Sequence, residues 1–61
     1  MPVVELKTLG KLSRQQKAEI TRRFTRTLQD VAGKDPGSVY VIIREIEPSS
    51  WGHAGVLFSD K

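Results

Sequence analysis

The segment at residues 38–46, SVYVIIREI, is apolar on both faces of the β-strand that it predicts. Successive side chains of a strand point to opposite faces. One face therefore takes Val39, Val41 and Ile43, and the other takes Tyr40, Ile42 and Ile46. A strand covered on both sides is typical of a sheet with a layer above it and a layer below it. Because the rest of the chain predicts only one helix, we expect the second layer to come from another subunit.

That helix is predicted over residues 14–32. Ser13, followed three residues later by Gln16, has the form of a capping box. Apolar residues then recur with the spacing of one helical face, at Ile20, Phe24, Leu28 and Val31. Gly33 suits the position just after a helix, and KDPG at 34–37 predicts a turn.

The remaining segments complete one small domain over residues 1–61. PVVELKTL at 2–9 predicts a first strand ended by Gly10, and residues 49–61 predict a short hairpin or an arm laid on a neighbouring subunit. Two parallel strands joined through a helix should cross over right-handed. The predicted fold class is therefore α/β (α+β), a single β-α-β unit with a C-terminal hairpin or arm, assembling into multi-subunit sheets.

A chain of 61 residues buries little apolar surface by itself and usually needs disulfides, a metal or oligomerisation for stability. It has no cysteine, and His53 is its one histidine, so self-association remains and we expect no metal or cofactor. No apolar run approaches the ~20 residues of a membrane span, and no signal peptide precedes the first strand. We therefore expect a cytoplasmic protein, and the net charge of +3 makes an anionic partner plausible.

Pro2 stands directly behind Met1, and two interpretations of it are open. It is either an ordinary residue at the start of a strand or, after removal of Met1, a free secondary amine. An α-amino group has a pKa of about 7.7 to 8.0, and apolar surroundings lower it towards neutrality, where a general base is most effective. If Met1 stays in place, the Pro2 nitrogen is an amide and cannot act as a base.

A base of this kind needs an anion-binding partner and walls that exclude water. Lys11 and Arg44 are candidates for holding a carboxylate or polarising a carbonyl, with solvated surface charges as the alternative. Trp51 and Tyr40 are candidates for the walls, with plain packing as the alternative. His53 is best explained as a loop residue, since further metal ligands are absent.

With these residues placed, the chain resembles the 4-oxalocrotonate tautomerase family. The resemblance rests on the order and spacing of MPVVELK, SRQQKAEI, SVYVIIREI and SSWGHAG, and covers nearly all 61 residues. It implies that the processed amino-terminal proline, Pro2, is the catalytic base of a keto-enol tautomerase. It also implies that Trp51 shields the proline, and that the chain forms hexamers built from dimers with sites between subunits.

Two positions depart from the family pattern. Leu12 stands where well-studied members have an arginine that binds a substrate carboxylate, and Tyr40 stands where they have a second arginine. Because lysine lacks the guanidinium fork, Lys11 is only a partial substitute. We therefore expect a monocarboxylic enol or keto acid, such as a phenylpyruvate-like acid, with Arg44 as the substitute cation on the strand face that also carries Ser38 and Tyr40.

Two other functions remain open. The chain could be a non-catalytic subunit or binding module that keeps the same oligomeric scaffold, which the two missing arginines favour. It could also bind nucleic acid through Arg22, Arg23 and Arg26 on the polar face of the helix. A solvated helix face explains these arginines equally well, and no nucleic-acid-binding signature accompanies them, so this function is disfavoured.

Overall fold

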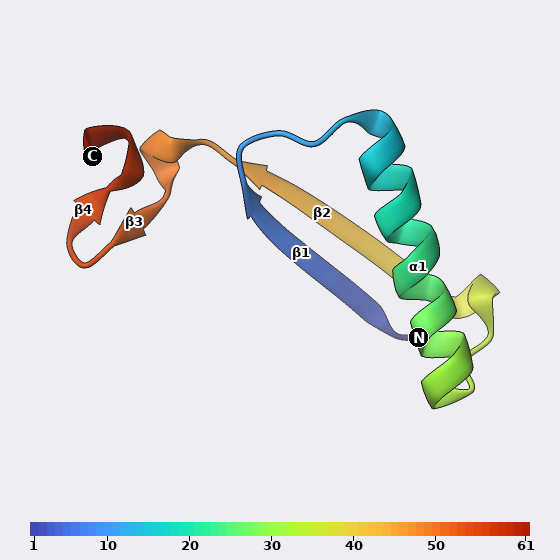
Figure 1. The fold of residues 1–61 in the computed structure, drawn as a ribbon. Helices are drawn as coiled ribbons and strands as arrows, with labels where there is room; N and C mark the ends of the chain where they lie inside the picture. Colours follow the sequence, from blue (N-terminus) through green and yellow to red (C-terminus); the bar gives the residue numbers. More distant parts are fainter.

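The computed structural model describes residues 1–61 and contains one β-α-β unit followed by a small hairpin (Figure 1). Its helices and strands are β1 (Val3–Leu9), α1 (Arg14–Ala32), β2 (Tyr40–Ile46), β3 (Gly52–His53) and β4 (Val56–Leu57). Short 3-10 helices occupy Pro36–Ser38, Pro48–Ser50 and Phe58–Asp60. The predicted β-α-β unit and C-terminal hairpin are confirmed. None of the helices is long and apolar enough to cross a membrane.

Strands β1 and β2 pair in parallel, and α1 connects the end of the first to the start of the second. The register runs from Val3 opposite Tyr40 to Leu9 opposite Ile46. Main-chain hydrogen bonds beyond the register extend the ladder, from Tyr40 N–H to the Pro2 carbonyl and from Gly10 N–H to the Ile46 carbonyl. Both strands therefore begin at the same end of the sheet, and Pro2 lies at that end.

The ends of α1 are set by local capping. The Ser13 hydroxyl accepts from the Gln16 amide at 3.1 Å, and the Gln16 side chain accepts from the Ser13 amide at 2.9 Å. Gly33 adopts a left-handed conformation with φ 65°, which closes the helix because a Cβ disfavours this region. The predicted bounds of 14–32 and the capping box are confirmed.

One face of the two-stranded sheet packs under α1. Side chains alternate between half-buried and exposed along β1 and along β2 as far as Arg44. The half-buried set under the helix includes Val4, Leu6, Val41 and Ile43. Ile20, Phe24 and Leu28 of α1 are also half-buried, as predicted. The prediction for Val31 is wrong, since it is 82% exposed. A helix of 19 residues spans about 28 Å and overruns a seven-residue strand of about 23 Å, so its last turn lies past the sheet (Figure 1).

The second strand begins at Tyr40 rather than at residue 38. The Asp35 side chain accepts from the Gly37 amide at 3.2 Å, and the Asp35 carbonyl accepts from the Ser38 amide at 2.9 Å. The Ser38 hydroxyl also donates to that carbonyl, at 2.8 Å. These local bonds, with Pro36 at the first position, form a 3-10 turn that holds Ser38 out of the ladder.

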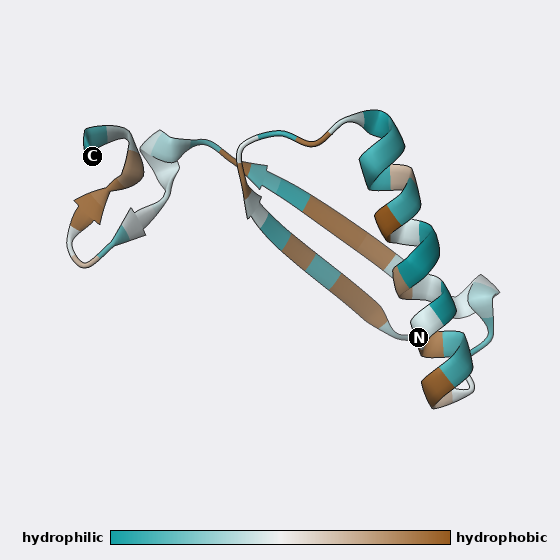
Figure 2. Ribbon diagram, in the orientation of Figure 1, coloured by the Kyte–Doolittle hydropathy of each residue, from teal (hydrophilic) through white to brown (hydrophobic).

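The other face of the sheet has no cover within the chain. Val3, Leu9, Tyr40 and Ile42 are 54%, 38%, 53% and 41% exposed, and Figure 2 shows apolar bands on both strands. The accessible surface is 4827 Å², whereas a compact monomer of this mass exposes about 3950 Å². The radius of gyration is 14.7 Å, against about 10.5 Å for a compact domain. The single chain does not close a core, because no residue is fully buried.

Candidate active site

Pro2 lies at the end of the sheet where both strands begin. The Tyr40 amide donates to the Pro2 carbonyl at 3.0 Å, so the sheet holds the carbonyl side of this residue. Pro2 is half-buried, whereas Met1 before it is 86% exposed. With Met1 in place the Pro2 nitrogen is an amide. Removing Met1 would leave the new amine at a position that the ladder already holds.

Two of the predicted substrate-binding residues lie at the same end of the sheet as Pro2. Tyr40 is the first residue of β2 and is 53% exposed on the uncovered face. Ser38 lies two positions earlier, with its hydroxyl bonded to the Asp35 carbonyl at 2.8 Å. The start of the two strands therefore combines a proline, a phenol and a hydroxyl.

Lys11 and Trp51 lie at the opposite end of the sheet. At about 3.3 Å per residue, the seven-residue strand β1 that separates Pro2 from Lys11 spans about 23 Å. Trp51 directly precedes the C-terminal hairpin, which projects beyond the ends of β1 and β2 (Figure 1). Its ring packs edge-on against Phe58 with centroids 6.3 Å apart, and its carbonyl accepts from the Phe58 amide at 2.8 Å. A single chain therefore does not bring Pro2 together with either residue.

Arg44 lies between the two ends, on the uncovered face of the sheet. Its Nε donates to Oε2 of Glu5 at 2.6 Å, and the Lys7 ammonium lies 3.9 Å from Oε1 of the same carboxylate. The hydrogen bond from Arg44 is the largest cause that lowers the pKa of Glu5 below its ordinary value. Arg44 lies on the same face of the sheet as Tyr40, as alternation predicts. The carboxylate of Glu5 compensates part of its charge.

A hollow of about 410 Å³ opens beside Lys11. Its lining residues are Gly10, Lys11, Glu45, Ile46, Glu47 and Pro48. Lys11 is exposed and forms no ion pair. The hollow combines this lysine with two carboxylates, and one of them, Glu45, is itself neutralised.

Glu45 was not singled out from the sequence. Its Oε2 accepts from the Leu12 amide at 2.8 Å, and its Oε1 lies 2.7 Å from the Lys17 ammonium. The Lys17 hydrogen bond, followed by that of the Leu12 amide, lowers the pKa of Glu45. The signal was available, since alternation places this charged residue on the same face as Val41 and Ile43.

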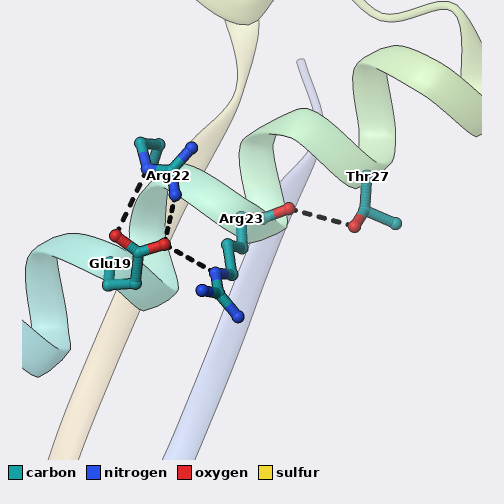
Figure 3. Close-up of polar contacts among 4 residues, drawn as sticks. All are labelled: Glu19, Arg22, Arg23 and Thr27. Carbon is teal, nitrogen blue, oxygen red and sulfur yellow. Dashed lines mark hydrogen bonds and ion pairs between the residues drawn. The ribbon is translucent and has the colours of Figure 1, made fainter.

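Acids of the same helix pair with the three arginines of the predicted basic face, Arg22, Arg23 and Arg26. Arg22 and Arg23 both bind the Glu19 carboxylate (Figure 3). Arg26 Nε lies 3.0 Å from the Asp30 carboxylate. Figure 3 also shows the Thr27 hydroxyl donating to the Arg23 carbonyl, at 3.0 Å. No group of three or more histidine, cysteine, aspartate or glutamate residues is placed to hold a metal ion.

Solved structures share this architecture and define the class. A 4-oxalocrotonate tautomerase homologue of known crystal structure superposes with a TM-score of 0.90 and 34% identity, over 100% of this chain and 97% of its own. A heterohexamer 4-oxalocrotonate tautomerase from Chloroflexus aurantiacus superposes with a TM-score of 0.85 and 25% identity, over 98% and 97%. The molecule has the β-α-β fold of the 4-oxalocrotonate tautomerases.

Sequence comparison gives the family itself. The family model described as tautomerase enzyme matches residues 2–61. A probable tautomerase of Ralstonia nicotianae is 33% identical over 61 residues, which cover 100% of this chain and 94% of that protein. A probable tautomerase of Dickeya dadantii is 36% identical over 56 residues, covering 90% and 84%. The chain belongs to the tautomerase family, as a 4-oxalocrotonate tautomerase homologue, and the predicted resemblance is confirmed.

Proposed function

We propose that the chain is a keto-enol tautomerase that uses the Pro2 amine, freed by removal of Met1, as its general base. The observation that carries the proposal is the placement of Pro2. Its carbonyl is held by the Tyr40 amide at 3.0 Å, while the residue before it is 86% exposed and open to processing. Membership of the tautomerase family supports the same reaction class.

The chemistry needs one group that takes and returns a proton. The neutral amine accepts a proton from one atom of the enol or keto acid, and the resulting ammonium returns a proton to another atom. No atom is gained or lost, which is what an isomerase requires. An amine with a pKa near neutrality is present in the neutral form at physiological pH and also returns the proton readily. Apolar surroundings favour that neutral form.

The substrate that fits best is a small monocarboxylic enol or keto acid. Lys11 is a cation without an ion pair in the chain and can hold the substrate's carboxylate. The polar contacts and walls come from Ser38, Tyr40, Arg44 and Trp51. Because Leu12 and Tyr40 replace two arginines, a second carboxylate has no bidentate partner. The length of β1, about 23 Å, separates Pro2 from Lys11 within one chain, so a site that contains both requires residues from two copies.

Assembly supplies the missing cover. We propose a homohexamer, a trimer of dimers, in which the uncovered face of the sheet and the C-terminal hairpin pack on other copies. The exposed apolar residues of β1 and β2 and the large surface of the isolated chain support association. A related 4-oxalocrotonate tautomerase is a heterohexamer. The cytoplasmic location remains a prediction from the sequence.

Turnover of the enol form of phenylpyruvate tests the reaction. Mass measurement of the purified protein first establishes that Met1 has been removed. The Pro2→Ala variant is then expected to lose at least about a hundredfold in kcat/KM, since general-base catalysis supplies a factor of this size or more. Pro36→Ala, in the turn before β2, is a matched control expected to keep parental activity. A processed Pro2→Ala variant as fast as the parent would rule out proline base catalysis.

A non-catalytic scaffold subunit is the second candidate. The pairing of Arg44 with Glu5 at 2.6 Å favours it, because that pairing reduces the positive charge available to a substrate. Under this alternative, protein purified from its native host keeps Met1. Protein from which Met1 has been removed for the test assembles but does not turn over enol acids. Turnover abolished by Pro2→Ala would exclude it.

A further inference from the structure

Glu45 is a charged residue on the face of the sheet that packs under α1. It lies one residue before the end of β2, and its side chain is 26% exposed. Each of its two oxygens has a different partner, the Leu12 amide at 2.8 Å and the Lys17 ammonium at 2.7 Å. The carboxylate therefore joins three segments, the end of β2, the turn after β1 and the first turns of α1.

The turn that carries Lys11 is held on both sides by the end of β2. Before Lys11, the Gly10 amide donates to the Ile46 carbonyl at 2.9 Å, and Gly10 bends the chain with φ 82°. After Lys11, the Leu12 amide donates to Glu45 at 2.8 Å. Lys11 lies between these two attachments, and both line the hollow beside it through Gly10 and Glu45.

We propose that Glu45 is a positioning residue that fixes the turn at residues 10–12, and that it thereby sets the affinity of the site for the substrate carboxylate through Lys11. The proposal rests on the proposed function, in which Lys11 binds that carboxylate. Glu45 itself does not touch substrate, since its two oxygens already have protein partners.

The two bonds of Glu45 are expected to matter unequally. The bond to the Leu12 amide acts directly on the turn, because Leu12 follows Lys11 in the chain. The ion pair with Lys17 joins the strand to the helix without touching the turn. Glu45→Ala removes both bonds, whereas Lys17→Met keeps the bond to Leu12 and removes the ion pair alone. Lys17→Met is therefore the matched control.

A double-mutant cycle between Glu45 and Lys11 tests the proposal. KM and kcat are measured for the enol of phenylpyruvate and for its methyl ester, which lacks the carboxylate charge. Glu45→Ala is expected to raise KM for the acid about fivefold, with kcat and the ester KM changed by less than about twofold. Lys17→Met should leave the acid KM within about twofold of the parent. In the Lys11→Ala background, Glu45→Ala should add no further increase.

The opposite results overturn the proposal. An equal loss on acid and ester, or a fivefold increase that persists without Lys11, would show that Glu45 only stabilises the fold. If the alanine variant fails to assemble, Glu45→Leu keeps side-chain volume under α1, removes both bonds and is carried through the same cycle. The conservative Glu45→Gln retains an oxygen for the Leu12 amide and should restore an acid KM near that of the parent.

Failure of the proposed function gives a different result. In that case the processed parent shows no turnover of either compound. The role of Glu45 is then tested by measuring the affinity for 3-phenylpropanoate. The NMR chemical shifts of Lys11 report the binding. Binding about fivefold weaker in Glu45→Ala than in Lys17→Met supports the positioning role. Equal binding in the two variants overturns it.

Discussion

The amide of Tyr40 donates a main-chain hydrogen bond of 3.0 Å to the carbonyl of Pro2, which places these residues side by side at the end of the sheet where both strands begin. The side chain at position 40 thus starts next to the proposed base. The resemblance implies an arginine at this position in well-studied members of the family, whereas this chain carries a neutral phenol. The identity of residue 40 should therefore set which acids the site accepts.

Tyr40→Arg is expected to shift substrate preference towards dicarboxylic enol acids. A guanidinium can bind a second carboxylate with two parallel hydrogen bonds, which a phenol cannot do. We expect the ratio of kcat/KM for a dicarboxylic over a monocarboxylic enol acid to rise by about tenfold. Tyr40→Lys restores charge without the fork and should give a smaller gain. An unchanged ratio in Tyr40→Arg would show that residue 40 does not face the substrate.

Ile42→Asp is expected to break the assembly. Ile42 is 41% exposed on the face of the sheet that no element of its own chain covers. An aspartate there would place an unpaired charge in the interface between copies. Gln15→Asp is the matched control, because Gln15 is a polar and exposed residue in the first turn of α1. Sedimentation should show smaller species for Ile42→Asp alone, and hexamers in both variants would place the interface elsewhere.

Acidification is expected to weaken the folded protein. Hydrogen bonds from basic side chains lower the pKa values of three glutamates. Arg44 acts on Glu5, and Lys17 acts on Glu45. Arg22 and Arg23 act on Glu19. A carboxyl with a lowered pKa contributes stability above its unfolded value, about 4.3, and loses that contribution as the pH falls through the folded value. Thermal melts should therefore show Tm decreasing below about pH 4.3. Glu45→Gln should flatten this dependence, and an unchanged slope would show that Glu45 does not contribute.

Gly33→Ala is expected to destabilise the end of α1. Gly33 has φ 65°, where an alanine is strained, and its amide donates to the Gln29 carbonyl at 3.2 Å. The cost should be about 1 kcal/mol. Gly37→Ala is the control, because Gly37 has no positive φ and its added Cβ would meet only ordinary contacts with Asp35. Equal changes in the free energy of unfolding would contradict a role for the left-handed conformation.

The sequence predicted those features that depend on neighbouring residues. The capping box joins residues three apart, and the left-handed turn at Gly33 depends on the glycine itself, so the bounds of α1 were correct. Period-two alternation likewise placed Arg44 on the same face as Tyr40. The start of β2 was less well predicted, because the Asp35 carbonyl captures Ser38 in a local turn that competes with the ladder.

Tertiary structure decided what depends on the register between distant segments. The bond from Leu12 to Glu45 joins residues 33 apart, and the bond from Arg44 to Glu5 joins residues 39 apart. Neither follows from local pattern, because each depends on how two strands align once the helix has packed on them. The sequence alone thus determined the elements and the family, whereas folding in three dimensions decided which charges meet and which stay apart.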